Sequence, residues 1–270
     1  MNTLPIIGFI GGGNMAQAIL AGLRRAGAAA GRFVVVEPAP AQRALLSQTL
    51  GITALAQATE ALARAEVVVW AVKPQLFEEA ATPCRTHVAG ALQLSIMAGI
   101  RTQAIVAASG SARVVRAMPN TPALIGQGIT GLYARPEVGP GEREQVEAVL
   151  QPTGQLLWVP REDDLDAVTA LSGSGPAYVF YFVEAMVRAG VRMGLTATQA
   201  RQLAEQTFAG AASLSAGSQE TPETLRARVT SKGGTTHAAL ASLEADGVGA
   251  AFERALLAAR ARAEELGRPS

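Results

Sequence analysis

The chain has 270 residues, 49% of them apolar and 17% charged, which is enough to bury a sizeable core and to form two domains. Its net charge is +1, and its arginines, two lysines and acids are scattered along the chain. This distribution excludes the basic stripe typical of nucleic-acid binding. One cysteine and two histidines exclude a disulfide framework and make a conventional zinc site improbable.

The first apolar run, residues 4–10, is too short for a signal sequence or a membrane span. No basic residue precedes it, and it breaks into glycines. We therefore expect a cytoplasmic protein with neither a membrane nor a nucleic acid as its partner.

Short apolar runs alternate with amphipathic segments up to about residue 160. The runs read PIIGFIG, FVVVE, EVVVWAV, LQLSI and ARVVRAM. Continuous runs of this length are typical of parallel strands that are covered on both faces, and the segments between them supply the crossover helices. This pattern predicts an α/β fold with a doubly wound, mostly parallel sheet.

After GQLLWVP at 154–160, the chain reads as helices only. We therefore expect two domains, residues 1–160 and residues 161–270, the second all-helical. A helix starting at Pro176 carries apolar residues around its whole circumference at 177–183, so it must be buried on all sides. Because a domain of this size can scarcely surround one helix, we expect a second copy of the chain to cover it, which predicts a homodimer.

The first strand runs into a glycine-rich turn, Gly11-x-Gly13-x-x-Ala16, that opens a helix. In a dinucleotide-binding fingerprint, the first glycine makes the turn, the second admits the pyrophosphate, and the third small residue lets the helix pack closely. Free N–H groups at the helix N-terminus favour an anion there. The pattern predicts a Rossmann-like cofactor domain, although alone it is a weak signal.

Glu37 supports that interpretation because it ends the second strand, 21 residues after Ala16. A carboxylate there can accept hydrogen bonds from the ribose hydroxyls of the adenosine and would repel a 2′-phosphate, which favours NADH over NADPH. No arginine follows directly, since Arg43 is six residues further on. The alternative is a solvated carboxylate before a turn at Pro38.

Three further turns follow strands: AVKPQ, MAG and MPNTP. Strand C-terminal ends form the edge of an open α/β sheet where ligands bind, so three turns there favour a crevice over plain loops.

No obvious general base accompanies these turns. SGSGP at 172–176 lies between helices, and we interpret Ser174 as a helix cap. No lysine occurs between Lys73 and Lys232, so the chemistry should need little proton transfer from the protein.

A second informative stretch precedes a helix near residue 236. It offers backbone N–H groups, hydroxyls and one cation, which suit a carboxylate, in the residues Ser231, Lys232, Gly233, Gly234, Thr235 and Thr236. From spacing alone, an elaborate helix cap explains this stretch at least as well.

Together, GFIGGGNMAQAI, AVKPQ, RAMPNTPALIGQG, LSGSGPAYVF and PETLRARVTSKGGTTHAALASLE resemble pyrroline-5-carboxylate reductase over nearly the whole chain. The resemblance implies NAD(P)H-dependent reduction of 1-pyrroline-5-carboxylate to L-proline, the last step of proline biosynthesis. It also implies a helical domain that interlocks in a dimer, often assembled into larger rings.

By motif, the resemblance assigns pyrophosphate binding to Gly11, Gly13, Asn14, Met15 and Ala16. It assigns other cofactor contacts to Ala71, Val72, Lys73, Pro74, Met97, Ala98, Gly99, Asn120 and Thr121. Substrate would bind the segment from Ser231 to Thr236, with the Thr236 hydroxyl near the ring nitrogen as the catalytic group. An iminium carbon already accepts hydride readily, which explains the missing base.

The chain departs from the family at three positions. Met97 stands where alanine is common and could narrow the nicotinamide pocket, Lys232 stands where many members have proline, and Ala58 stands where some have asparagine. Two other functions remain open: reduction of another cyclic imine, and a catalytically silent dinucleotide sensor.

Overall fold

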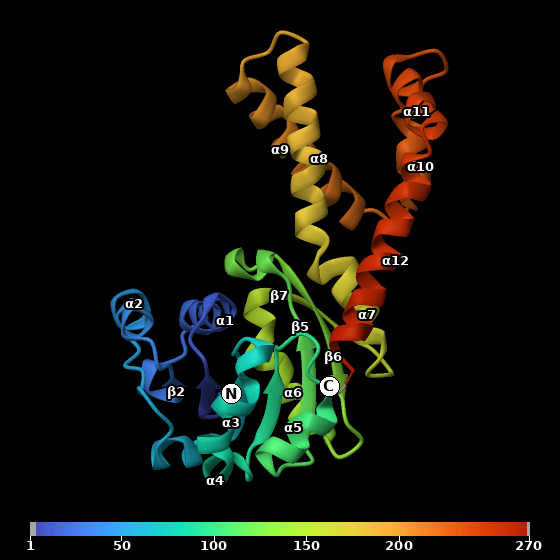
Figure 1. Cartoon of the computed structure of the whole chain (residues 1–270). Helices are drawn as coiled ribbons and strands as arrows, with labels where there is room; N and C mark the ends of the chain where they lie inside the picture. Colours follow the sequence, from blue (N-terminus) through green and yellow to red (C-terminus); the bar gives the residue numbers. More distant parts are fainter. Residues whose placement is uncertain (1–3, 269–270) are drawn as a thin grey trace. The chain divides into compact units, whose positions relative to one another are not determined.

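The computed structural model describes residues 4–268, which divide into two compact units (Figure 1). The first unit contains the described residues up to Ser174 together with those from Ala259 onward. The second unit contains Gly175–Ala258. The second unit is thus inserted in the sequence between two segments of the first unit.

A seven-stranded sheet forms the centre of the first unit, in the order β2-β1-β3-β4-β5-β6-β7. Its strands are β1 (Ile7–Ile10), β2 (Phe33–Val36), β3 (Val67–Trp70), β4 (Leu92–Ser95), β5 (Val114–Met118), β6 (Gly128–Ala134) and β7 (Gly154–Trp158). Strands β1 to β5 are parallel, β6 is antiparallel to β5, and β7 is parallel to β6. The prediction of a mostly parallel α/β sheet is confirmed.

Helices cover both faces of this sheet, as the continuous apolar runs require. They are α1 (Asn14–Arg25), α2 (Pro40–Leu50), α3 (Phe77–Ala81), α4 (Arg85–Val88), α5 (Thr102–Ser109), α6 (Pro140–Leu150) and α7 (Asp164–Val168). One core joins sheet residues such as Phe9 to α1 and α6, where Leu20 and Val146 are buried. The other joins Trp70 to Phe77 of α3 and Ile105 of α5.

Strand β6 was not predicted from the sequence because GITGLYA is not a continuous apolar run. Its glycines are required by tertiary packing. A Cβ on Gly131 would lie 2.6 Å from a Val168 methyl group, and one on Gly128 would lie 2.9 Å from the Thr153 carbonyl oxygen. Close approach by neighbouring groups, which the local sequence does not encode, therefore dictates small residues here.

The second unit is built from helices alone. They are α8 (Gly175–Arg192), α9 (Ala197–Ala216), α10 (Pro222–Arg228), α11 (Thr235–Ala245) and the part of α12 (Val248–Leu266) up to Ala258. The Phe252 ring packs edge-on against Tyr178 and Phe182, each with ring centroids 5.6 Å apart. Helices α8 and α9 approach closely because Gly190 lacks a Cβ that would reach Ala200. No helix within residues 4–268 has the length and apolarity needed to cross a membrane.

Helix α8 leaves much of its apolar surface uncovered in the single chain. The Phe180 and Tyr181 side chains are 61% and 65% exposed. The helix begins at Gly175, so Pro176 is its second residue rather than its first. Ser174, which we expected to cap this helix, follows a π-helical turn over Thr169–Gly173, and its N–H donates to the Thr169 carbonyl.

Cys84 is buried beneath the sheet, where its thiol donates to the Ala80 carbonyl at 3.1 Å. Burial raises the pKa of this thiol to about 11. Since the thiolate is the reactive form, we expect no modification by a disulfide reagent at about pH 8 in the folded protein and full modification after unfolding. Rapid reaction of the native protein would contradict this placement.

Candidate functional site

The predicted cofactor residues of the first unit lie at one edge of the sheet. Gly11 follows β1, Glu37 follows β2, Ala71 follows β3, Ile96 opens the turn after β4, and Asn120 lies two residues beyond β5. These five strands are parallel, so all five turns share the carboxyl edge of the sheet. The structure therefore brings together segments that lie more than a hundred residues apart in the sequence.

The glycine turn has the shape that a pyrophosphate needs. Gly11 has φ +96°, and a Cβ there would lie 2.6 Å from the Ala71 carbonyl oxygen, so no other residue fits easily. A Cβ on the exposed Gly13 would meet nothing within 4 Å. No side chain caps the N-terminus of α1 after Gly13, and its first turn contains no acid. These residues fit a dinucleotide, whose phosphates would meet free N–H groups.

Glu37 is bonded rather than solvated, so the alternative interpretation of its carboxylate is wrong. The residue is 9% exposed. One carboxylate oxygen accepts from the Gly12 N–H and the other from the Ala39 N–H, both at 2.8 Å. Glu37 therefore ties the glycine turn to the end of β2 at the position predicted to face the ribose.

Two glutamines that were not predicted from the sequence also hydrogen-bond Gly12. The Gly12 carbonyl accepts from the Gln42 amide at 2.6 Å and from the Gln17 amide at 3.2 Å. Gln42 lies 30 residues further along the chain on α2, so no local pattern marks it. Both the N–H and the carbonyl of Gly12 are thus bonded within the protein. The backbone N–H groups that could bind a phosphate are those of Gly13 and of the first turn of α1.

The turns after β3 and β4 differ in the groups that they present. Ala71 and Val72 lie next to Gly11, and Lys73 is exposed. The Met97 side chain is only 3% exposed and packs in the core with Trp70 and Ile105. The turn therefore offers Ala98, Gly99 and main-chain atoms, and the Met97 side chain fills the core instead of narrowing a pocket.

Asn120 directs its side chain into the protein. Its amide group donates to the Ser172 carbonyl at 3.1 Å and its oxygen accepts from the Ile129 N–H at 3.0 Å. It thus links the end of β5 to the π-helical turn before α8. Thr121, the next residue, is exposed and starts a short 3₁₀ helix.

In the second unit, the predicted substrate loop leads into α11. Gly233 has φ +77°, and Gly234 is the N-cap residue of the helix, without a side-chain cap bond. Among residues 4–268, the hydroxyls of Ser231, Thr235 and Thr236 have no hydrogen-bond partner. By contrast, Thr196 and Thr221 cap α9 and α10 through their hydroxyls. The stretch therefore supplies the N-cap residue of α11 but does not cap the helix through a hydroxyl.

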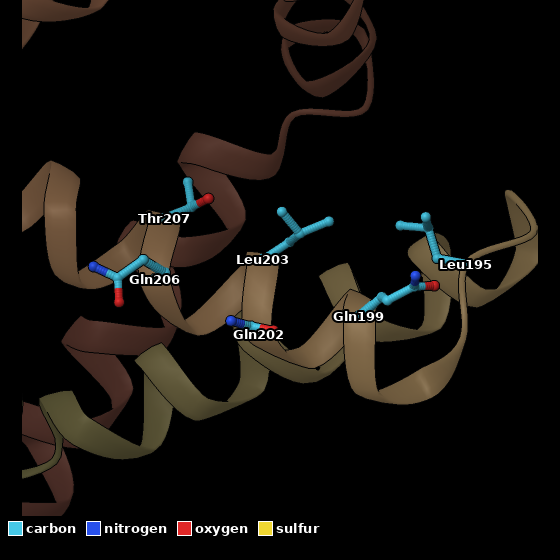
Figure 2. A pocket seen from close by; sticks show the side chains of 6 residues that line it. All are labelled: Leu195, Gln199, Gln202, Leu203, Gln206 and Thr207. Atoms are coloured by element: carbon cyan, nitrogen blue, oxygen red, sulfur yellow. The ribbon is translucent and has the colours of Figure 1, made fainter.

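A groove of about 500 Å³ on the second unit is lined by none of the residues in these motifs. Figure 2 shows its lining along α9 and the turn before it: Leu195, Gln199, Gln202, Leu203, Gln206 and Thr207. None of these side chains ionises, so the groove offers no acid or base. Residues 4–268 also hold no group of three or more His, Cys, Asp or Glu side chains arranged for a metal ion.

Comparison with known proteins identifies the family. A pyrroline-5-carboxylate reductase from Pseudomonas aeruginosa is 44% identical over 266 residues, which cover 97% of each chain. The chain belongs to the pyrroline-5-carboxylate reductase family. The solved family member from Coxiella burnetii superposes with a TM-score of 0.92 at 36% identity, covering 98% of this chain and all of the other.

The matches also divide along the chain. Residues 162–266 match the pyrroline-5-carboxylate reductase dimerisation family and include the loop Ser231–Thr236. Residues 6–99 match the coenzyme F420-dependent NADP oxidoreductase family and include the glycine turn. A pyrroline carboxylate reductase from Plasmodium falciparum, solved with NADP bound, superposes with a TM-score of 0.87 at 26% identity over 99% of this chain and all of the other. The family is one of NAD(P)-dependent oxidoreductases, as the sequence predicted.

Proposed function

We propose that this chain reduces 1-pyrroline-5-carboxylate to L-proline with a reduced nicotinamide cofactor. Membership of the reductase family over 97% of the chain carries this proposal. The loop Ser231–Thr236 supports it, because its hydroxyls and the N-terminus of α11 are not used up by capping. These donors suit the carboxylate of a small cyclic imino acid.

In this proposal, the chain orients the substrate and hydrogen-bonds its ring nitrogen, and it transfers few or no protons. The bound cofactor supplies the hydride. The loop before α11 orients the substrate by its carboxylate, and the Thr236 hydroxyl donates a hydrogen bond to the ring nitrogen. Because the substrate reacts as the protonated iminium, hydride transfer to its carbon leaves a neutral amine and needs no proton from the protein. The Thr236 hydroxyl donates to the nitrogen lone pair that forms, so orientation supplies most of the catalysis.

A second reaction, reduction of a six-membered cyclic imine, would use the same loop, and a silent dinucleotide sensor would use only the first unit. A substrate panel separates the two reductions, and any turnover excludes the sensor, whereas chiral analysis of the product tests the orientation of the ring. We expect L-proline as the product from racemic pyrroline-5-carboxylate, with the other enantiomer of the substrate left over. Formation of racemic proline, or no proline, would contradict the assigned orientation of the ring.

For the cofactor, we propose a preference for NADH. The Glu37 carboxylate is fixed at the end of β2 by two backbone N–H groups, so it cannot swing away from a 2′-phosphate without breaking these bonds. Arg43 tempers the repulsion, because its guanidinium donates to the carbonyls of Glu37 and Pro38 at 3.0 and 2.6 Å. This turn therefore carries one negative charge, on the Glu37 carboxylate, and one positive charge, on the Arg43 guanidinium.

Replacing Glu37 by serine should raise the ratio of NADPH to NADH efficiency, because it removes the repulsion. It should also weaken both cofactors, since the buried Gly12 N–H loses its acceptor, at a cost of about 1–3 kcal/mol. Glu37→Gln is the matched control, because an amide oxygen can still accept from Gly12 without a charge. Steady-state kinetics with both cofactors measures the ratio, and a ratio unmoved in both variants would show that Glu37 does not face the ribose.

We further propose that residues 1–160 bind the cofactor and that residues 161–270 bind substrate and form the homodimer. The match to the dimerisation family and the exposed rings of Phe180 and Tyr181 support a second copy over α8. Assembly of such dimers into a ring, and a cytoplasmic location, remain predictions from the sequence. Light scattering of the purified protein should give at least twice the monomer mass of 27.8 kDa.

A further inference from the structure

A network of buried charges holds the turn that follows β4. Arg116 lies in the middle of β5 with its side chain only 5% exposed, and its terminal nitrogen donates to Glu162 at 2.9 Å. Burial lowers the pKa of this arginine, whereas the nearby Glu162 carboxylate opposes that shift. An arginine inside a buried strand is tolerated only when it is paired, so Glu162 is required by Arg116.

Glu162 also caps α5 from sixty residues away. One of its oxygens accepts from the Thr102 N–H at 2.7 Å, and the other accepts from the Thr102 hydroxyl at 2.8 Å. Thr102 is the first residue of α5, which has no cap from its own N-cap residue. A single carboxylate thus joins the start of α5 to the middle of β5, at the favourable end of the helix dipole.

The residues just before α5 are fixed by the same segment of the chain. Arg101 donates to Asp166 of α7 at 2.6 Å and to Asp163 at 3.0 Å. Asp166 is 4% exposed at its side chain, so the first of these pairs is largely shielded from water. Arg101 stands two residues after Gly99, the end of the turn predicted to meet the nicotinamide.

The C-terminal end of α12 packs against this turn. A Cβ on Gly99 would lie 3.0 Å from the Leu266 carbonyl oxygen, and one on Gly267 would lie 2.8 Å from the Arg101 guanidinium. Residues 162–166 precede the second unit, and residues 266–267 follow it. Both connections to the helical unit are therefore anchored on the turn Met97–Gly99 and its continuation into α5.

The geometry points to Glu162 as a positioning residue that holds the turn Met97–Gly99 where the nicotinamide ring docks. This inference rests on the proposed function for the identity of the ring. It adds that placement of the ring depends on a carboxylate outside the cofactor motifs. We propose that the adenosine and pyrophosphate bind at the ends of β1 and β2, so a change at Glu162 should not alter their binding.

Binding of two related ligands tests this division. NADH contains the nicotinamide, whereas ADP-ribose contains only the rest, and calorimetry gives the Kd of each. In Glu162→Gln, we expect the Kd of NADH to rise roughly tenfold while that of ADP-ribose changes by less than about twofold. The kcat of imine reduction should fall by roughly ten- to a hundredfold, because a displaced ring loses its alignment.

Glu142 provides the matched control. Its carboxylate is also 20% exposed, accepts from the Gly139 N–H at a helix start, and pairs with Arg113. It caps α6, and within residues 4–268 it makes no hydrogen bond or ion pair with the turn. Glu142→Gln should cost similar stability, yet the ratio of the two Kd values should stay at the wild-type level.

A milder pair of variants covers the case in which Glu162→Gln does not fold. Thr102→Val removes only the hydroxyl bond to Glu162, whereas Thr102→Ser keeps it. We expect the first to raise the ratio of the two Kd values and the second to restore it. Equal changes for NADH and ADP-ribose, or no change in either, would overturn the inference. Because the two Kd values are measured without an imine, a wild-type protein that fails to reduce pyrroline-5-carboxylate would contradict only the proposed function.

Discussion

Replacing Gly13 by valine should abolish NADH binding while the protein stays folded. A Cβ at this position meets nothing within 4 Å, and the backbone has φ −68°, which any residue adopts. The valine side chain would occupy the space in which the pyrophosphate approaches the N-terminus of α1. We expect the Kd of NADH to rise at least roughly a hundredfold, measured by fluorescence titration.

Stability separates this effect from damage to the fold. Loss of glycine at the N-cap of α1 should cost about 1 kcal/mol in the free energy of unfolding. The control is Gly11→Ala, in which the new Cβ would lie 2.6 Å from the Ala71 carbonyl oxygen at a φ of +96°. That variant should lose stability along with binding. Normal NADH affinity in Gly13→Val would mean that no pyrophosphate lies at this turn.

Replacing Thr236 by alanine should lower kcat/KM for the imine by roughly ten- to a hundredfold. The expected loss is about 1–3 kcal/mol, the value of a buried hydrogen bond to the ring nitrogen. The Thr236 hydroxyl has no partner among residues 4–268, so its removal should not lower the unfolding temperature. NADH affinity should also stay unchanged.

Two further substitutions make the Thr236 result specific. Thr236→Ser keeps the hydroxyl and should recover most of kcat/KM. Thr196→Ala removes a hydroxyl that accepts from the Gln199 N–H and caps α9, so it should lower stability by about 0.5–2 kcal/mol and leave kcat/KM alone. Unchanged kinetics in Thr236→Ala would remove this hydroxyl from the catalytic role.

Much of the first unit could be predicted because its strands are buried on both faces. Such strands favour continuous apolar runs. Strands β2 and β3 are such runs, β4 and β5 are interrupted by Gln93 and Arg116, and β6 is interrupted by glycines. The positions of the glycine turn after β1 and of Glu37 after β2 were also predictable, since both belong to a short motif with a known spacing. The spacing did not reveal that Glu37 bonds the Gly12 N–H, because the turn of β1 and the end of β2 meet only in the folded sheet.

The supporting contacts of the site could not be predicted in the same way. Gln42 and Glu162 act on residues 30 and 60 positions away, and nothing in their own surroundings marks them. One signal was present: Arg116 interrupts the apolar run VVRAM, and a cation in a buried strand needs a partner. The identity of that partner depends on how the 159–166 segment returns to the sheet, which is a property of the fold.

The central claim is that this chain reduces a five-membered cyclic imine with a nicotinamide cofactor. Its most direct test follows the absorbance of NADH and of NADPH when the purified protein meets racemic pyrroline-5-carboxylate, beside the six-membered imine. We predict rapid oxidation of the cofactor that favours the five-membered ring, with NADH ahead of NADPH. Binding of NADH without turnover of either imine would contradict the claim and favour a silent dinucleotide sensor.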